Sequence, residues 1–214
     1  MRRVKAPGLI TYNERFAQKR TDSHLSLISI TLTLFIFVSC FEGDGRYAEL
    51  VNKANELGRA GDCASALDFY NKAIEIDSTQ AEAYFNRALC QEILGQIDSA
   101  EVDYTRAILR DTDFADSYFN RGIVRFNQGR YRAALYDFSD AYAIDSSDLE
   151  ALSEVARSYL HLGLLDSALI LQDRVIGEGP ENAAMLNNRA EILRRLGRYN
   201  ESLLDLHKAI SMDT

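Results

Sequence analysis

Apolar and polar positions repeat along residues 47–214 with a period of 34 and without an insertion. Within each period, apolar residues recur at helical spacing, stop at a glycine, and then resume at helical spacing. A glycine between two helical patterns is typical of a turn with positive φ. The glycine column is complete, with Gly61, Gly95, Gly129, Gly163 and Gly197. The pattern predicts five helix-turn-helix units, at residues 47–80, 81–114, 115–148, 149–182 and 183–214.

Small residues also recur in register, at positions where the two helices of a unit would pack closely. The first-helix column contains Ala54, Ala88, Gly122, Ala156 and Ala190, and a second-helix column contains Ala66, Ala100, Ala134, Ala168 and Ser202. Large apolar residues form another second-helix column, with Tyr70, Tyr104, Phe138 and Leu206, which Gln172 interrupts. Two prolines in 214 residues also favour long helices over loop-rich β-structure.

These columns resemble the tetratricopeptide repeat (TPR) family, and the resemblance covers residues 47–214. In the second repeat, residues 81–114, it rests on Tyr84, Ala88, Gly95, Ala100, Tyr104 and Ala107. It implies an all-α, right-handed superhelical solenoid of five 34-residue units, whose first helices line a concave groove. The proline that often closes a unit occurs once, as Pro180. No capping helix follows the fifth unit, so we expect fraying, self-association or a partner at its apolar flank.

The first forty residues have a different pattern, because residues 25–38 are uncharged and follow a net-basic segment. As a helix this stretch would span about 21 Å, less than the ~30 Å hydrocarbon core, which favours a secretory signal over a membrane span. Ser39 and Cys40 resemble the lipobox of bacterial lipoproteins, although Phe37 departs from that motif. We therefore expect a lipoprotein-type signal peptide at residues 1–40 with cleavage before Cys40, lipidation of Cys40, and a flexible tether at residues 41–46. Ordinary secretion, an uncleaved anchor and a buried cytosolic segment remain open.

The charge distribution limits the class of partner. The net charge is −8 overall, and residues 41–214 carry −12 because the first forty residues are net basic. An acidic body repels phosphate backbones, so we expect no nucleic-acid partner.

The resemblance to TPR proteins also implies which side chains face the groove. Asparagines recur in one first-helix column, and an amide both donates to and accepts from a peptide backbone. The candidates for groove lining are Asn52, Asn55, Phe85, Asn86, Leu89, Phe119, Asn120, Ile123, Phe126 and Asn188. The alternative interpretation is that these asparagines and rings only pack within the repeats. Val51 and Asp116 stand where chaperone-tail clamps carry cations, so we expect no binding of that kind.

The remaining residues with reactive side chains do not form a catalytic pattern. His24, His161 and His207 are far apart in the sequence. Cys63 and Cys90 lie in adjacent repeats, and the sequence is compatible with two free thiols or with a disulfide between them. We therefore expect no catalytic residues, metal or cofactor. The basic column Lys53, Arg87, Arg121 and Arg189 is interpreted as solvated or as an inter-repeat salt-bridging position.

The sequence predicts a non-enzymatic protein-interaction module that binds an extended peptide or a helix of an envelope protein in its concave groove. We expect it to be exported and lipid-anchored to a bacterial membrane, on the periplasmic face or the cell surface. One alternative is a self-associating scaffold of a membrane-bound assembly, as a homo-oligomer through the C-terminal repeat. Another is an accessory domain of a larger complex.

Overall fold

The computed structural model describes the backbone of residues 30–212 and the side chains of residues 45–212. This part of the chain is all-helical, with ten α-helices and no strand. The chain divides into two compact units after Thr112. Unit 1 contains α2 (Ile30–Arg59), α3 (Cys63–Ile76), α4 (Ala81–Ile93) and α5 (Ile97–Arg110). Unit 2 contains α6 (Ala115–Asn127), α7 (Tyr131–Ile144), α8 (Leu149–His161), α9 (Leu165–Glu178), α10 (Ala183–Arg195) and α11 (Tyr199–Met212).

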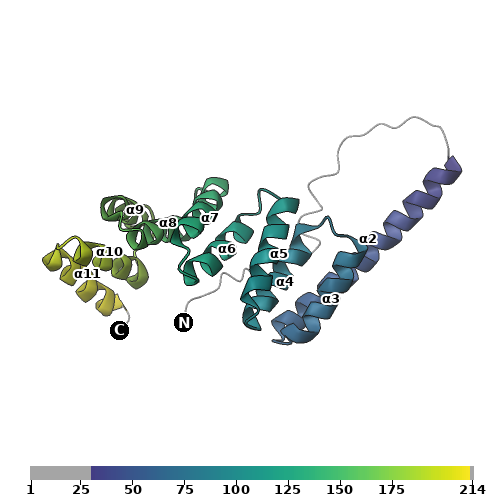
Figure 1. Ribbon diagram of the computed structural model, residues 1–214, viewed down its shortest axis with the longest axis horizontal. Helices are drawn as coiled ribbons and strands as arrows, with labels where there is room; N and C mark the ends of the chain where they lie inside the picture. Colours follow the sequence, from purple (N-terminus) through teal and green to yellow (C-terminus); the bar gives the residue numbers. More distant parts are fainter. Residues whose placement is uncertain (1–29, 213–214) are drawn as a thin grey trace. The chain divides into compact units, whose positions relative to one another are not determined.

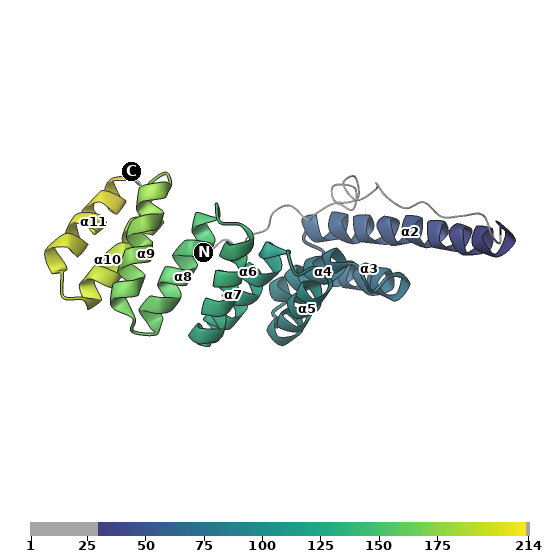
Figure 2. The ribbon, with the colours of Figure 1, turned by 90° about the horizontal axis from the view of Figure 1, so that it is seen from above.

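Each helix packs against the next one in the chain within its unit, as Figure 1 shows for α3, α4 and α5 and Figure 2 for α8 to α11. The two helices of each pair are joined at one of the predicted glycines, and all five glycines have φ between 75° and 84°. Non-glycine residues rarely adopt this conformation. The predicted helix-turn-helix pattern is therefore confirmed at all five turns.

The core of unit 1 forms where small residues of the first helices meet rings of the second helices. Ala54, Ala66 and Tyr70 are fully buried in one cluster that also contains Cys63 and Cys90. A neighbouring cluster contains Tyr47, Val51, Ala73 and Ala83. Both cysteines are buried free thiols. Burial raises the pKa of the Cys90 thiol well above its ordinary value, which disfavours the reactive thiolate.

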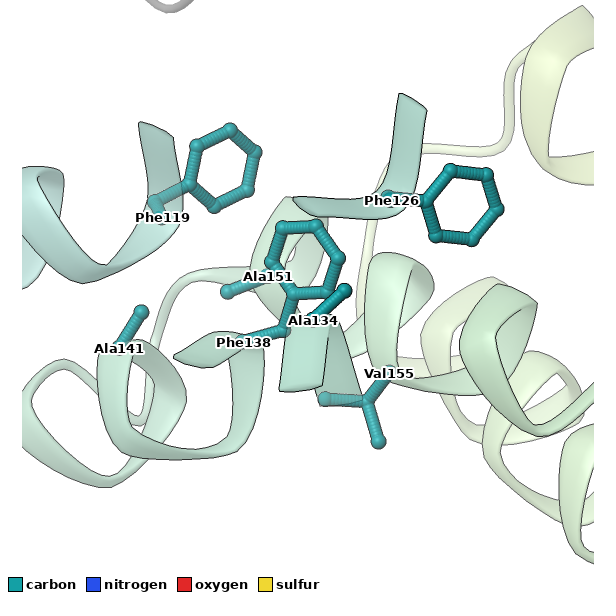
Figure 3. Close-up of a cluster of buried hydrophobic side chains, with 7 residues drawn as sticks. All are labelled: Phe119, Phe126, Ala134, Phe138, Ala141, Ala151 and Val155. Atoms are coloured by element: carbon teal, nitrogen blue, oxygen red, sulfur yellow. The ribbon is translucent and has the colours of Figure 1, made fainter. Parts of the chain in front are cut away.

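The core of unit 2 is aromatic around α6 and α7. Phe119, Phe126 and Phe138 form a buried cluster with Ala134, Ala141, Ala151 and Val155 (Figure 3). Gly122 stands in the small-residue column because a Cβ at this position would lie 2.7 Å from Phe138 Cε1. That distance is shorter than van der Waals contact, so the ring of Phe138 occupies the space that an alanine methyl group would need.

The start of α2 differs from the expected flexible tether. The helix runs without a break through residues 41–46. Gly43 and Gly45 weaken a helix, but no proline stops it, and the buried residues Tyr47 and Val51 hold its following turns. The tether prediction is therefore corrected to a helical segment.

The signal-peptide prediction falls mostly outside the described residues, since residues 1–29 are not among them. Cys40 lies within α2, but its side chain is not described, so its lipidation stays a prediction. Among the described helices, none combines the length and the apolar character needed to cross a membrane.

Candidate functional site

Two of the candidate asparagines meet in unit 1, where they join α2, α3 and α4. The Tyr70 hydroxyl donates to Asn55 Oδ1 at 2.6 Å, and Asn86 Nδ2 donates to the same oxygen at 3.1 Å. All three side chains are at most 1% exposed. Asn86 Oδ1 is buried without a hydrogen-bond partner. The network therefore has one spare acceptor, and this acceptor belongs to a predicted ligand-binding residue.

Unit 2 has a polar link of the same kind between α8, α9 and α10. Asn188 Nδ2 donates to Ser153 Oγ at 3.3 Å, and the Ser153 hydroxyl donates to Gln172 Oε1 at 3.3 Å. Gln172 Nε2 then donates to the backbone oxygen of Met185 at 3.0 Å. Gln172 occupies the same repeat position as Tyr70, which explains why a polar residue interrupts that apolar column. The interruption is visible in the sequence, whereas the network depends on contacts among three helices.

The aromatic candidates lie in the core and not on an open surface. Phe85 packs on Tyr104 with ring centroids 5.8 Å apart, and Phe119 packs on Phe138 at 5.5 Å. Phe126 makes T-shaped contacts with Tyr131 and His161, with ring centroids 5.0 and 4.9 Å apart. These three phenylalanines are at most 7% exposed. For the rings, therefore, the packing interpretation describes the structure.

The other candidates differ in their exposure. Leu89 and Asn120 are buried, and Ile123 and Asn188 are half-buried. Asn52 is exposed and lines an open cavity of about 300 Å³ on α2 and α3, together with Glu49 and Phe69. The structure thus brings Asn55 and Asn86 into contact and leaves Asn52 on a separate surface.

The three arginines of the basic column form ion pairs with aspartates, whereas Lys53 is exposed and pairs with Glu56 of its own helix at 3.2 Å. Arg87 donates from Nε and Nη2 to the two carboxylate oxygens of Asp103 at 2.6 and 2.7 Å, and from Nη1 to Asn71 Oδ1 at 2.6 Å. Arg189 binds Asp205 in the same bidentate way and reaches Asp173 at 3.1 Å. Each arginine thus binds its own second helix and the second helix of the preceding repeat. The inter-repeat contact is a salt bridge for Arg189, as the sequence predicts, and a hydrogen bond to a neutral amide for Arg87.

Arg121 repeats this arrangement on its own second helix. It donates to Asp137 at 2.7 Å, and Arg125 donates to the same carboxylate at 2.9 Å. Burial raises the pKa of Asp137 above its ordinary value, although both arginines act in the opposite direction. We interpret this buried carboxylate as a packing element. Among the described residues, no group of three His, Cys, Asp or Glu side chains could hold a metal ion.

Curated proteins match short stretches of this chain. Among curated proteins, an uncharacterized protein of Methanocaldococcus jannaschii is 44% identical over 48 residues, which are 22% of this chain and 56% of that protein. Serine/threonine-protein phosphatase T of Schizosaccharomyces pombe is 51% identical over 41 residues, 19% of this chain and 9% of the phosphatase. The matches thus span about half of the first protein and about a tenth of the second.

Solved structures match a larger part of the chain. MamA of Desulfovibrio magneticus RS-1 superposes with a TM-score of 0.74 at 14% identity, over 78% of this chain and 95% of that one. YrrB, described as "a TPR protein with an unusual peptide-binding site", gives 0.70 at 24% identity, over 82% and 91%. A tetratricopeptide repeat protein from Parabacteroides merdae gives 0.67 at 22% identity, over 78% and 65%. At these identities the likeness concerns the fold.

Family models provide the assignment. Three of them, each described as tetratricopeptide repeat, match residues 69–102, residues 94–149 and 119–183, and residues 182–212. Together they cover the chain from the second helix of the first repeat to the end of α11. With the five glycine turns and the all-α fold, these matches show that the chain belongs to the tetratricopeptide repeat family.

Proposed function

We propose that this chain is a non-enzymatic module that binds an extended peptide or a helix of another protein along the first helices of its repeats. The tetratricopeptide fold is typical of protein-interaction scaffolds. Such a scaffold is ordered before binding, so less conformational entropy is lost when a ligand docks. The peptide-binding site named for YrrB supports a peptide ligand, because that protein has the same fold.

One observation carries the proposal: the buried oxygen of Asn86 that lacks a hydrogen-bond donor. An unsatisfied buried acceptor costs roughly 1–3 kcal/mol, and a peptide N–H group would remove that cost. Asn86 is 0% exposed, so a ligand reaches this oxygen only after a local rearrangement. A binding step that needs such a rearrangement has a lowered association rate.

A second part of the proposal concerns the location of the module and rests on its N-terminal segment. We propose that a lipid on Cys40 holds the chain on a bacterial membrane, on the periplasmic face or the cell surface, and that its partner is an envelope protein. The uncharged residues 25–38 and the Ser39–Cys40 pair support this proposal. Lipid chains at that point would provide stable anchoring without a spanning helix.

Crosslinking and pull-down from envelope fractions test the binding proposal. We expect a chain with Asn86→Ala and Asn120→Ala to lose partner capture, while Asn127→Ala, which changes an exposed asparagine of α6, keeps it. Equal partner capture by the wild type, the double variant and Asn127→Ala would remove the support for the first-helix site. In the same fractions, Cys40→Ala should leave the membrane pellet, and persistent membrane binding would contradict the lipid anchor.

A second candidate function is self-assembly, which the exposed apolar face of α11 favours. Leu203, Leu206 and Ile210 are 52%, 37% and 65% exposed. In α9 the equivalent face packs against α10, so α11 presents a surface that another repeat would cover. Sedimentation across a hundredfold concentration range distinguishes the two functions. A scaffold should associate and be dispersed by Leu203→Glu with Ile210→Glu, whereas a peptide receptor should remain a monomer.

A further inference from the structure

A second surface of unit 1 lies between its two second helices, apart from the asparagines of the first helices. Helices α3 and α5 flank α4 there (Figure 1) and enclose an open cavity of about 530 Å³. This volume falls in the range of ligand-binding clefts. Its lining includes Leu67, Asn71, Arg87, Gln91 and Val102. We call this cavity the α3–α5 trough.

The charges that line the trough balance, because the lining holds two arginines, Arg87 and Arg106, and two carboxylates, Asp98 and Asp103. Both arginines that line it, Arg87 and Arg106, donate to the same buried carboxylate of Asp103, at 2.6 and 2.9 Å. Arg87 also donates to Asn71. A free anion would therefore have to compete with Asp103 for either guanidinium. The trough consequently favours an uncharged ligand over an ionic one.

Gln91 is the residue of the trough that repeat packing does not require. Its side chain is 9% exposed, and its Oε1 atom is buried without a hydrogen-bond partner. The same repeat position holds Leu57, Tyr159 and Leu193, and in the third repeat Arg125, which is paired with Asp137. An apolar residue or a paired cation stabilises the fold at this position, whereas a buried unpaired amide destabilises it. The polar side chain of Gln91 therefore indicates a ligand.

Unit 2 provides a matched reference for this interpretation. An equivalent cavity of about 310 Å³ lies between α9 and α11, with Arg189 in place of Arg87 and Leu193 in place of Gln91. Arg198 and Glu201 also line it and bind each other at 2.6 Å. The repeat architecture therefore produces a cavity in both units, and the unpaired amide distinguishes the one in unit 1.

We propose that the α3–α5 trough is a second peptide-binding surface, which takes a neutral, extended segment of a partner protein. A glutamine amide carries both donors and an acceptor, so it matches the peptide group. Leu67 and Val102 offer an apolar wall to an aliphatic side chain, and Val102 is 49% exposed. This site uses the second helices and does not depend on the first-helix site proposed above.

The test probes the full chain with an array of N-acetylated, C-amidated hexapeptides. One set is neutral, built from Ala, Val, Leu, Ser, Asn and Gln, and two further sets carry acidic or basic residues. We expect the wild type to select neutral members that contain an aliphatic residue. Gln91→Leu should weaken that binding at least tenfold while its thermal midpoint stays equal or rises, because the substitution removes a buried unpaired amide.

The control is the converse change in unit 2. Leu193→Gln should lower the thermal midpoint and leave the selected peptides unchanged. The proposal is overturned if the wild type binds none of the neutral set, if it prefers charged members, or if Gln91→Leu keeps its affinity within twofold. A lower midpoint in Gln91→Leu would likewise overturn it, because Gln91 would then be a structural residue. The Asn86→Ala variant should retain the array pattern, so the failure of either site is distinguishable from that of the other.

Discussion

The two units place an arginine at the same position but surround it differently. In unit 1, Arg87 is 12% exposed and binds one carboxylate and one amide, from Asp103 and Asn71. In unit 2, Arg189 is 26% exposed and binds two carboxylates, from Asp205 and Asp173. The shared pair joins the two helices of its repeat, whereas the residues around it differ between the two units. Gln91 opposite Leu193 is the clearest of these differences.

The largest effect should come from removing the carboxylate of each pair. Asp103→Ala leaves Arg87 nearly buried with only an amide partner, so we expect the helices of unit 1 to lose about 3 kcal/mol. Asp205→Ala leaves Arg189 paired with Asp173, so we expect the helices of unit 2 to lose only about 1 kcal/mol of stability. Native-state hydrogen exchange, followed separately in the two units, measures both losses. Equal losses would show that the second carboxylate gives Arg189 no protection.

A smaller effect should follow when the small-residue column is exchanged between the units. Gly122→Ala places a methyl group 2.7 Å from Phe138 Cε1, and we expect a loss of about 2 kcal/mol from overpacking. Ala88→Gly in unit 1 relieves no such contact and should cost about 1 kcal/mol of helix propensity. Urea unfolding followed by circular dichroism compares the two variants. A stabilised Gly122→Ala protein would mean that the ring of Phe138 moves aside freely.

The polar links provide a third comparison. Tyr70→Phe removes one of two donors to the buried Asn55 Oδ1, and we expect a cost of about 1 kcal/mol. Gln172→Leu restores the apolar column but leaves the Met185 carbonyl oxygen without its side-chain donor, so the two effects should nearly cancel. Thermal melting of both variants beside the wild type tests this order. If Gln172→Leu is the more damaging change, the link in unit 2 contributes more than the one in unit 1.

The smallest effect is a pH dependence of opposite sign in the two units. Burial raises the pKa of Glu92 above its ordinary value of 4.5, although the Tyr104 hydroxyl donates to this carboxylate. The stabilising contribution of Glu92 is therefore present below 4.5 and is lost as the pH rises through the folded pKa. Hydrogen bonds from Arg194 and Arg195 lower the pKa of Glu191 to about 2, so its contribution is present above 4.5 and is lost as the pH falls toward 2.

Hydrogen exchange between pH 4 and pH 7 should therefore show α4 and α5 losing protection relative to α10 as the pH rises, after correction for the intrinsic exchange rate. Glu92→Gln keeps a hydrogen-bonding partner for Tyr104 and should abolish the trend in unit 1. Glu191→Gln should leave that trend unchanged. The assignment fails if Glu92→Gln retains the wild-type slope.

The turns and helix pairs could be predicted from the sequence because glycine adopts positive φ with little strain, and a glycine recurs at every turn. The exposure of the first-helix residues could not be predicted in the same way. Phe85 and Asn86 lie on α4, which packs against α2, α3 and α5 and buries ten of its thirteen residues. Periodicity within one repeat marks a single apolar face of a helix, whereas the stacking of repeats covers that helix from several sides. The role of Gln91 depends on whether its amide has a partner, which only the three-dimensional contacts reveal.

The arginine pairs also have a direction along the chain. Arg87 in the second repeat reaches back to Asn71 in the first, and Arg189 in the fifth reaches back to Asp173 in the fourth. A ribosome releases the N-terminal repeats first. When each of these arginines emerges, the second helix of the preceding repeat has already been synthesised and can serve as a template. The direction of these contacts therefore favours repeats that fold one after another during translation, each on the repeat made before it.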